Sequence, residues 1–414
     1  MLHRASPIDR VVILNDATTA RGGATGLALL SIRLLRARGV AVTYIVGDDG
    51  ESDELEALGV EIVAMGGKQL VAERRLTALT RGICNTRAEA GVAEWIAGND
   101  TPRTIYHVHG WSKILSPSIF SALRPVASRT YTHAHDYFLA CPNGAYMDYP
   151  HEAPCTRVPL GLSCLGTNCD KRSYPQKLWR SARRVALDKA RGPASWRPTI
   201  MIHEAMAPAM ERAGYDSQNL VALRNPAGAF SSERVRAEDN SLFCFIGRVE
   251  REKGIEDALA AAAKAGVRLR VIGDGPLREE LAARWPDVEF TGWASRDQVS
   301  ELVRDARCVV VPSRYPEPFG LVIAEAAQSG IPVIVSDTAL LAADVANLGL
   351  GLSTTTRDID AFAAAMERIR DLPRDEIESM SRRGFAGTSR LASTDEAWAD
   401  GLMALYETSL VEAA

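Results

Sequence analysis

Residues 307–337 read RCVVVPSRYPEPFGLVIAEAAQSGIPVIVSD. The stretch opens with an apolar, β-branched run, passes through a turn containing proline and glycine into an alanine-rich segment, and closes with a second apolar run. A strand, a crossover helix and a second strand in this order are typical of a parallel sheet covered by helices. The stretch therefore predicts an α/β fold.

The same alternation continues upstream, where helix-like segments separate short apolar runs. The runs nearest to this stretch are SLFCFIGRVE (241–250), RLRVIGDG (268–275) and DVEFTGW (287–293). An earlier series consists of VVILN (11–15), VAVTYIVG (40–47), VEIVAMG (60–66), TIYHVH (104–109) and SRTYTHAH (128–135). Two such series in one chain predict two Rossmann-like domains.

The length agrees with this division, because 414 residues exceed one ordinary core and suit two domains of roughly 200 residues each. We predict an N-terminal domain at 1–228 and a C-terminal domain at 229–395. A cysteine- and proline-rich insert at about 137–197 interrupts the first domain. The helical stretch 396–414 is a candidate to cross back onto the first domain.

Composition limits the function classes. The formal net charge is −4, with 24% charged and 46% hydrophobic residues, which is typical of a globular protein and not of a disordered or nucleic-acid-coating one. We find no signal peptide and no run of about 18 apolar residues, so membrane contact is expected to be peripheral at most. Seven cysteines without an export signal favour reduced thiols. We expect a cytoplasmic protein, with peripheral contact on the inner face of the membrane.

Two glutamates mark the turn and helix inside the opening stretch. Glu317 precedes Pro318 and Gly320, which make a turn leading into a helix N-terminus, and Glu325 lies further along that helix. Backbone N–H groups at such a terminus suit phosphate or sugar oxygens, and a carboxylate can accept hydrogen bonds from ribose hydroxyls. The alternative is a solvated helix with two unrelated glutamates.

In its full context this segment resembles glycosyltransferase family 4 (group 1), whose second domain carries such a glutamate pair followed by a Gly-x-Pro-Val turn. The resemblance implies a GT-B fold, with two Rossmann-like domains facing across a cleft. It implies retaining transfer of a hexosyl group from a nucleoside-diphosphate sugar, a UDP- or GDP-sugar, held mainly by the second domain. Donor-binding roles then fall on Glu317, Glu325 and the turn Pro318, Phe319, Gly320 and Leu321.

The segment IGRVEREKG (246–254) resembles the family's strand-end arginine and lysine, which bind the donor pyrophosphate. Gly247, Arg248 and Lys253 match that motif. An arginine can fork two phosphate oxygens, and a lysine places a point charge against a leaving diphosphate. Gly273, in VIGDG, resembles the family's glycine-rich strand-to-helix turn. The alternatives are a surface salt bridge for the basic pair and an ordinary βα turn for the glycine.

In the first domain Gly22 and Gly23 resemble the family's glycine pair near the donor phosphates, although an ordinary tight turn is the alternative. The strand ends YHVHGW and THAHDYF place two histidines each on one side of the sheet. The resemblance assigns His135 to the reacting sugar, and His109 is a second candidate facing the cleft. Metal binding by the four histidines is a rival reading, and satisfied core histidines are another.

Four cysteines lie in the insert, at Cys141, Cys155, Cys164 and Cys169. Their gaps of thirteen, eight and four residues are looser than those of a zinc ribbon, yet four thiolates could close a tetrahedral structural zinc site. Packed or free thiols are the alternative. Some polysaccharide-building members of the family carry a similar cysteine-rich insert, which implies a role in surface polysaccharide biosynthesis.

The stretch 171–197 carries nine basic residues and one acidic residue, with tryptophans and a leucine between them. It could contact an anionic membrane surface or a lipid diphosphate acceptor, and a solvated basic helix is the alternative. The acceptor is therefore expected to be a glycan or a lipid-linked molecule. Asp358-x-Asp360 is better explained as a helix cap than as a metal site.

The sequence therefore predicts a retaining glycosyltransferase with catalytic roles for His135, Arg248, Lys253 and Glu317. It implies no required cofactor, no catalytic metal and no nucleic-acid partner. Two rivals stay open: a sugar-nucleotide epimerase or hydrolase on the same fold, and a non-catalytic nucleotide-sugar-binding protein. A Rossmann dehydrogenase is disfavoured because the G-x-G-x-x-G fingerprint is absent from the first strand-to-helix turn.

Overall fold

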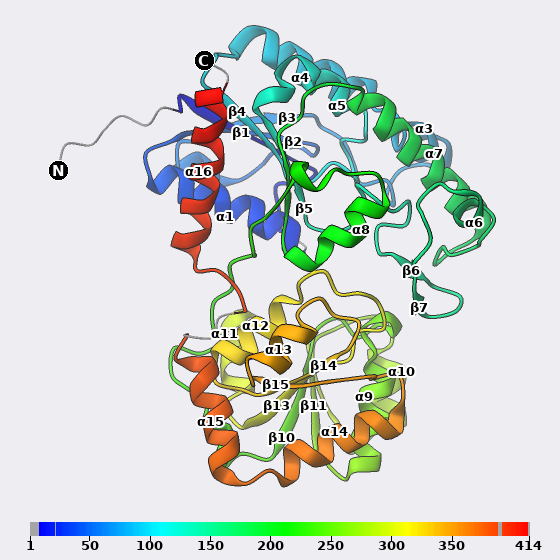
Figure 1. Cartoon of the computed structure of the whole chain (residues 1–414), viewed down its shortest axis with the longest axis vertical. Helices are drawn as coiled ribbons and strands as arrows, with labels where there is room; N and C mark the ends of the chain where they lie inside the picture. Colours follow the sequence, from blue (N-terminus) through cyan, green and yellow to red (C-terminus); the bar gives the residue numbers. More distant parts are fainter. Residues whose placement is uncertain (1–7, 21, 388–390, 413–414) are drawn as a thin grey trace, which may run out of the picture. The chain divides into compact units, whose positions relative to one another are not determined.

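The structure is a computed structural model that describes residues 8–20, 22–387 and 391–412 (Figure 1). The chain divides into two compact units. The first unit consists of Met1–Pro150, Cys155–Arg224 and Asp395–Ala414. The second unit consists of His151–Pro154 and Asn225–Thr394. Each unit is built on one parallel sheet.

The first unit contains a seven-stranded sheet in the order β3-β2-β1-β4-β5-β8-β9. Its strands are β1 (Arg10–Asn15), β2 (Ala41–Val46), β3 (Glu61–Ala64), β4 (Thr104–Val108), β5 (Thr130–Ala134), β8 (Thr199–Met201) and β9 (Leu220–Ala222). All neighbours in this sheet pair in parallel. The central strands are almost fully buried, as expected for apolar strands covered by helices on both faces.

Helices cover this sheet and belong to the same unit. They are α1 (Gly23–Ala37), α2 (Asp53–Ala57), α3 (Arg75–Arg81), α4 (Thr86–Asn99), α5 (Ile119–Leu123), α8 (Ala207–Arg212) and α16 (Asp395–Glu412). The C-terminal helix α16 lies beside α1 (Figure 1), and its Trp398 and Tyr406 are fully buried in the core of the first unit. The last helix of the chain is thus part of the first unit.

The insert between β5 and β8 is largely irregular. It contains the two-residue strands β6 (Met147–Asp148) and β7 (Ala153–Pro154), the short helix α6 (Leu162–Leu165) and the long helix α7 (Tyr174–Arg191). Ser173 caps α7 by accepting a hydrogen bond from the Gln176 amide, and Gly192 ends the helix with a φ of 56°. These are ordinary start and stop signals for a helix.

The second unit contains a six-stranded parallel sheet in the order β12-β11-β10-β13-β14-β15. Its strands are β10 (Leu242–Ile246), β11 (Leu269–Ile272), β12 (Glu289–Gly292), β13 (Ala306–Val311), β14 (Val333–Ser336) and β15 (Gly351–Thr354). The opening stretch of the sequence analysis forms β13, a turn, helix α12 (Leu321–Gln328) and β14. The prediction of a strand, a helix and a second strand is confirmed there.

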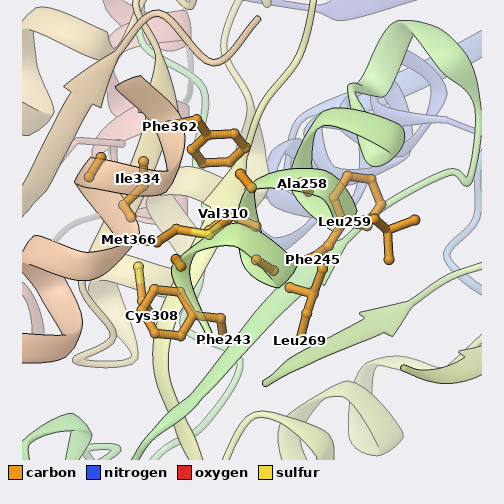
Figure 2. Packing of buried hydrophobic residues seen from close by; sticks show 14 of the residues in the cluster. Phe243, Phe245, Ala258, Leu259, Leu269, Cys308, Val310, Ile334, Phe362 and Met366 are labelled. Atoms are coloured by element: carbon orange, nitrogen blue, oxygen red, sulfur yellow. The ribbon is translucent and has the colours of Figure 1, made fainter. Parts of the chain in front are cut away.

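The other helices of this unit are α9 (Ile255–Ala265), α10 (Arg278–Arg284), α11 (Arg296–Leu302), α13 (Ala342–Asn347), α14 (Ile359–Asp371) and α15 (Arg374–Phe385). Figure 2 shows side chains of β10, β13, α9 and α14 gathered in one apolar cluster, with Phe243 and Phe362 fully buried. Asp358 accepts hydrogen bonds from the amides of Asp360 and Ala361 at the start of α14, so the helix-cap reading is confirmed.

The unit boundaries differ in detail from the predicted domains. The units change after Arg224 and after Thr394, whereas patterning placed the changes after 228 and 395. His151–Pro154, predicted to lie in the first domain, belongs to the second unit, because Glu152 pairs with Arg251 at 2.7 Å and with Arg314 at 3.1 Å. Such contacts between distant residues leave no local sequence signal. Within the described residues, no helix is long and apolar enough to span a bilayer.

Candidate active site

In each unit the chain reverses its direction of travel across the sheet between two central strands. In the second unit the reversal lies between β10 and β13, and in the first between β1 and β4. Ligands of open parallel sheets bind at the carboxyl ends of strands at such a switch point. The loops that follow these four strands carry most of the predicted site residues.

At the switch point of the second unit, Lys253 and Glu317 form a partly buried ion pair. Lys253 follows β10 and Glu317 follows β13, and their charged atoms lie 2.7 Å apart. The Lys253 ammonium also donates to the Tyr315 hydroxyl at 2.7 Å. The Ser313 hydroxyl donates to the same Glu317 oxygen at 2.7 Å. Two residues that are 64 positions apart thus share one hydrogen-bonded cluster.

The electrostatics of this cluster hold both charges in place. Burial alone would raise the pKa of Glu317, but the Lys253 ammonium, together with hydrogen bonds from Lys253 and Ser313, brings that pKa below its usual range. Burial and the neighbouring Glu317 carboxylate raise the pKa of Tyr315. At neutral pH the cluster therefore presents a fixed ammonium, a carboxylate and a neutral phenol.

Two glycines bring these loops close together. A Cβ on Gly254, whose φ is 71°, would lie 2.0 Å from the carbonyl oxygen of Pro312 at the end of β13. A Cβ on Gly273, whose φ is 142°, would lie 1.9 Å from the carbonyl oxygen of Gly247. No other residue fits these positions without moving the backbone. The backbone packing by itself explains Gly254 and Gly273, and the donor-binding roles of Gly247 and Gly273 stay predictions.

The turn before α12 has the predicted form. Gly320 is the N-cap of α12 in a left-handed conformation with a φ of 71°, and Leu321 begins the helix. Phe319 is buried and anchors the turn, while Pro318 is partly exposed. The first-turn amides of α12 therefore follow Glu317 directly, as a phosphate- or sugar-binding helix N-terminus requires.

Glu325 lies on α12, one turn beyond the start of the helix. Arg296, the first residue of α11, lies 3.3 Å from its carboxylate and also donates to the carbonyl oxygens of Gly228 and Ala229. Burial raises the pKa of Glu325 even though Arg296 opposes the shift. Burial deprives this carboxylate of hydrogen bonds from water. A ribose hydroxyl that donates to it would supply such a hydrogen bond.

Arg248 lies outside the Lys253 cluster in this structure. Its side chain is 73% exposed, and its guanidinium is paired with Glu250 at 2.7 Å. An exposed pair of this kind contributes little to stability, so the side chain can turn toward an anionic ligand at small cost. The predicted role of Arg248 in binding the pyrophosphate remains a prediction.

In the first unit a pocket of about 130 Å³ opens at the carboxyl ends of β1, β4 and β5. The predicted residues Gly22, Gly23, His109 and His135 all line it, together with Asp136. Gly22 has an extended backbone with a φ of 175°, and a Cβ placed there would meet no atom within 4 Å. The backbone at this position does not require glycine. A larger residue there would only take up space in the pocket.

The histidines of β4 and β5 form a buried ladder. His107 Nε2 lies 3.3 Å from His133 Nδ1, and His109 Nδ1 lies 3.0 Å from His135 Nε2. The Tyr406 hydroxyl of α16 lies 2.6 Å from His107 Nδ1. Burial lowers the pKa of all four rings, to about 3 for His135. The ladder is therefore neutral at physiological pH.

Three of these rings are close enough to hold a cation. One ring nitrogen each from His107, His109 and His133 lies within 4.8 Å of the others. Within the described part of the chain, Nε2 of His109 and Nε2 of His133 are buried without a hydrogen-bond partner. Metal binding by the histidines thus stays open beside the sugar-contacting role predicted for His109 and His135.

Lowering the pH from 7 to 5 is expected to lower the free energy of unfolding. The folded chain holds the four histidines neutral, with pKa values below the ordinary 6.5, so the unfolded chain binds more protons below pH 6.5. Each such ring then costs up to about 1.4 kcal/mol per pH unit. Burial raises the pKa of Asp136 to about 6, an effect of opposite sign that offsets about one histidine.

Urea unfolding of the wild type and of His133→Gln at pH 7 and at pH 5 measures this effect. The variant removes one titrating ring of the ladder, so it should lose less stability than the wild type over that interval. An equal loss in the two proteins would contradict the neutral ladder.

Two of the four cysteines of the insert contact the side chain of Asn143. Cys141 donates to the Asn143 side-chain oxygen at 3.2 Å, and the Asn143 amide lies 3.6 Å from the Cys169 sulphur. Cys164 is also buried and Cys155 is partly exposed. Among residues 8–20, 22–387 and 391–412, no three sulphurs meet the 4.8 Å spacing of the histidine group. Structural zinc at the cysteines stays a prediction.

Sequence reasoning missed several residues that contact the site. Asp16, directly after β1, accepts hydrogen bonds from the amides of Lys113, Ile114 and Leu115 at 2.7 to 2.9 Å and so fixes the loop after β4. Lys113 lines the pocket of the first unit. A polar Asn-Asp pair at the end of an apolar strand was the available signal for Asp16. Nothing local marked Lys113.

Comparison with known proteins finds a family match in the second unit. Residues 229–386 match the family model of glycosyl transferases group 1. The glycogen synthase of Mycobacterium tuberculosis (strain H37Rv) is 32% identical over 203 residues, 46% of this chain and 47% of that protein. The D-inositol 3-phosphate glycosyltransferase of Segniliparus rotundus is 30% identical over 222 residues, 50% of this chain and 47% of that protein. The chain thus spans about half the length of these relatives.

Solved structures extend the similarity in fold to nearly the whole chain. The sucrose-phosphate synthase of Thermosynechococcus elongatus aligns with 98% of this chain and 100% of its own, at a TM-score of 0.72 and 18% identity. Anabaena Alr3699/HepE in complex with UDP aligns with 96% and 100%, at a TM-score of 0.66 and 16% identity. At this identity the likeness shows the fold alone. The prediction of a GT-B fold built from two Rossmann-like domains is confirmed.

Proposed function

We propose that this protein is a retaining glycosyltransferase that moves a hexosyl group from a nucleoside-diphosphate sugar to an acceptor. The observation that carries the proposal is the partly buried Lys253–Glu317 pair at the β10/β13 switch point, inside the segment that matches group 1 glycosyltransferases. A fixed ammonium beside a carboxylate suits a substrate that combines a diphosphate with a sugar. The further assignment to family 4 belongs to the same proposal.

The proposed reaction breaks the bond between the anomeric carbon of the donor sugar and its phosphate oxygen. It forms a bond between that carbon and an acceptor oxygen on the same face, and the acceptor proton passes to the departing phosphate. Lys253 and Arg248 stabilise the growing charge on the diphosphate. Glu317 orients the sugar and the lysine, Glu325 accepts hydrogen bonds from the ribose, and His135 contacts the reacting sugar.

The donor in this proposal is a UDP- or GDP-sugar. Anabaena HepE has been solved in complex with UDP, with UDP and glucose, and with UDP-glucose, which supports a uridine nucleotide as the first candidate. The reaction as written needs no metal or further cofactor. The acceptor is a glycan or a lipid-linked molecule of surface polysaccharide assembly, met by peripheral contact at the inner face of the membrane, with the enzyme in the cytoplasm.

A thermal-shift panel of UDP-, GDP- and ADP-sugars tests the donor site. One nucleotide class is expected to raise Tm, because a ligand at about 100 times its Kd stabilises the folded chain by about 2.7 kcal/mol. Glu325→Ala and Arg248→Ala should weaken the shift. Glu301→Ala and Arg304→Ala remove an exposed ion pair at the end of α11 and should leave the shift unchanged. The absence of a shift with every nucleotide would contradict the proposal.

A further inference from the structure

Helix α7 has an unusual distribution of side chains, because charged residues are buried and apolar residues are exposed. Lys177, Arg183 and Arg184 are buried on its inner face, whereas Leu178 and Val185 are among the exposed large apolar residues of the chain. The alternative reading, a solvated basic helix, is therefore wrong for its three buried cations. A helix that only covered the sheet would place these residues the other way round.

Helix α7 contacts α3, which also carries exposed apolar side chains. The Trp179 ring nitrogen donates to the carbonyl oxygen of Leu79, which joins the two helices. Helix α3 has no buried residue, and Leu76 on it is 80% exposed. Val71, just before α3, is 73% exposed. Apolar side chains gathered on a surface in this way mark a site of interaction.

A second cavity, of about 770 Å³, lies between these helices. Its apolar lining includes Leu70, Val71, Leu79 and Trp179. It shares part of its wall with the pocket that contains the histidines, through Gln69, Ser112, Lys113 and Phe138. The two cavities thus adjoin, and a single elongated molecule could occupy both.

The charge of the second cavity is strongly positive. Its lining contains five basic residues, Arg75, Lys113, Arg172, Arg180 and Arg183, and one acidic residue, Glu73. Glu73 is already paired with Arg81 at 3.0 Å, and Arg180 is paired with Asp170 at 3.0 Å, which leaves four of the basic residues against no acidic residue of the lining. Arg183 is buried against the rings of Trp111 and Trp179, and its Nε has no hydrogen-bond partner in the described part of the chain. A buried guanidinium with an unused N–H requires an anion or water beside it.

We propose that the second cavity holds an acceptor that is an anionic amphiphile, a sugar joined through a diphosphate to an apolar chain. This inference rests on the proposed transfer reaction, for which it names the acceptor class. The acceptor sugar lies in the histidine pocket, and the diphosphate lies at the junction beside Lys113 and Arg183. The apolar chain follows Leu79 and Val71 toward the surface. From the histidine pocket outward, the lining is first polar, then basic and then apolar. The sugar, the diphosphate and the apolar chain of such a molecule follow one another in the same order.

Calorimetric titration with farnesyl diphosphate, farnesol and inorganic diphosphate tests this assignment. Farnesyl diphosphate is expected to bind at least about tenfold more tightly than either of the other probes, because only it engages both halves of the cavity. Leu79→Gln should weaken its binding about tenfold, and Leu76→Gln, one turn away and outside the lining, should not. Lys113→Gln, at the junction of the two cavities, should weaken it by a similar factor, and Lys171→Gln, outside the lining of both, should not.

Two results would overturn the inference. One is equal affinity for farnesyl diphosphate and inorganic diphosphate with no effect of Leu79→Gln, which would leave a simple anion site. The other is no binding of farnesyl diphosphate to a protein whose Tm still rises with nucleotides. That result would contradict the amphiphilic acceptor and leave the proposed transferase function standing. Binding of farnesyl diphosphate without binding of any nucleotide would support an amphiphile in the cavity and contradict the proposed transferase function.

Discussion

Replacing Lys253 with methionine is expected to lower kcat by about a hundredfold to a thousandfold. The ammonium is held 2.7 Å from Glu317 at the carboxyl end of β10, where the proposed reaction would place the growing charge of the departing diphosphate. Removing one such preorganised group from a protein site typically costs a factor of this size. Methionine keeps the apolar length of the side chain and removes only the charge. Steady-state release of nucleoside diphosphate measures the effect.

The lysine also neutralises a partly buried carboxylate, so stability must be separated from catalysis. Lys253→Met leaves the partly buried Glu317 without its cation, which is expected to lower the free energy of unfolding. The double variant Lys253→Met with Glu317→Gln should recover much of this stability and still fail to catalyse. Lys264→Met, which removes an exposed lysine paired with Asp360, serves as the control. Wild-type kcat in a folded Lys253→Met protein would contradict the role of the lysine.

Replacing His135 with alanine is expected to lower kcat by about a hundredfold while leaving the nucleotide-induced rise in Tm unchanged. His135 is the outer ring of the ladder and lines the pocket of the first unit, so the proposal gives it the reacting sugar and not the nucleotide. Positioned groups of this kind contribute about 10² to 10⁴. The measurement combines turnover with the thermal-shift panel on one preparation.

The exposed His151 provides a control for that substitution. His151→Ala should preserve both turnover and the thermal shift. If His135→Ala instead abolished the nucleotide-induced shift, the histidine would belong to the donor nucleotide site. Unchanged turnover would show that the ladder serves only the core of the first unit.

Much of the fold could be predicted because its signals are local. The strand at β13, the turn at Gly320 and the helix α12 each have a composition that a short window reveals, and so do the other central strands. The pairing of Lys253 with Glu317 is different, because the residues are 64 positions apart. Their loops meet only because β10 and β13 are neighbours at a switch point. Here the resemblance to known glycosyltransferases supplied what periodicity could not.

The histidine ladder shows the same limit. Alternation on a strand predicts that His107 and His109 share one face, and likewise His133 and His135. It does not predict that the two strands are adjacent, or that Tyr406, from a helix 299 residues away, would bond to His107. The buried arginines of α7 were missed for a related reason. The burial of Arg183 depends on the rings of Trp111 and Trp179, and only the folded chain brings those rings together.

The most direct test of the central claim is the product balance with a nucleotide-sugar of the class that raises Tm, measured with and without a candidate acceptor. The account predicts that nucleoside diphosphate is released in step with a new glycoside, that release depends on the acceptor, and that the anomeric configuration is retained. Release of free sugar without an acceptor would indicate a hydrolase, and a changed sugar would indicate an epimerase. Either result would contradict glycosyl transfer as the function of the Lys253–Glu317 site.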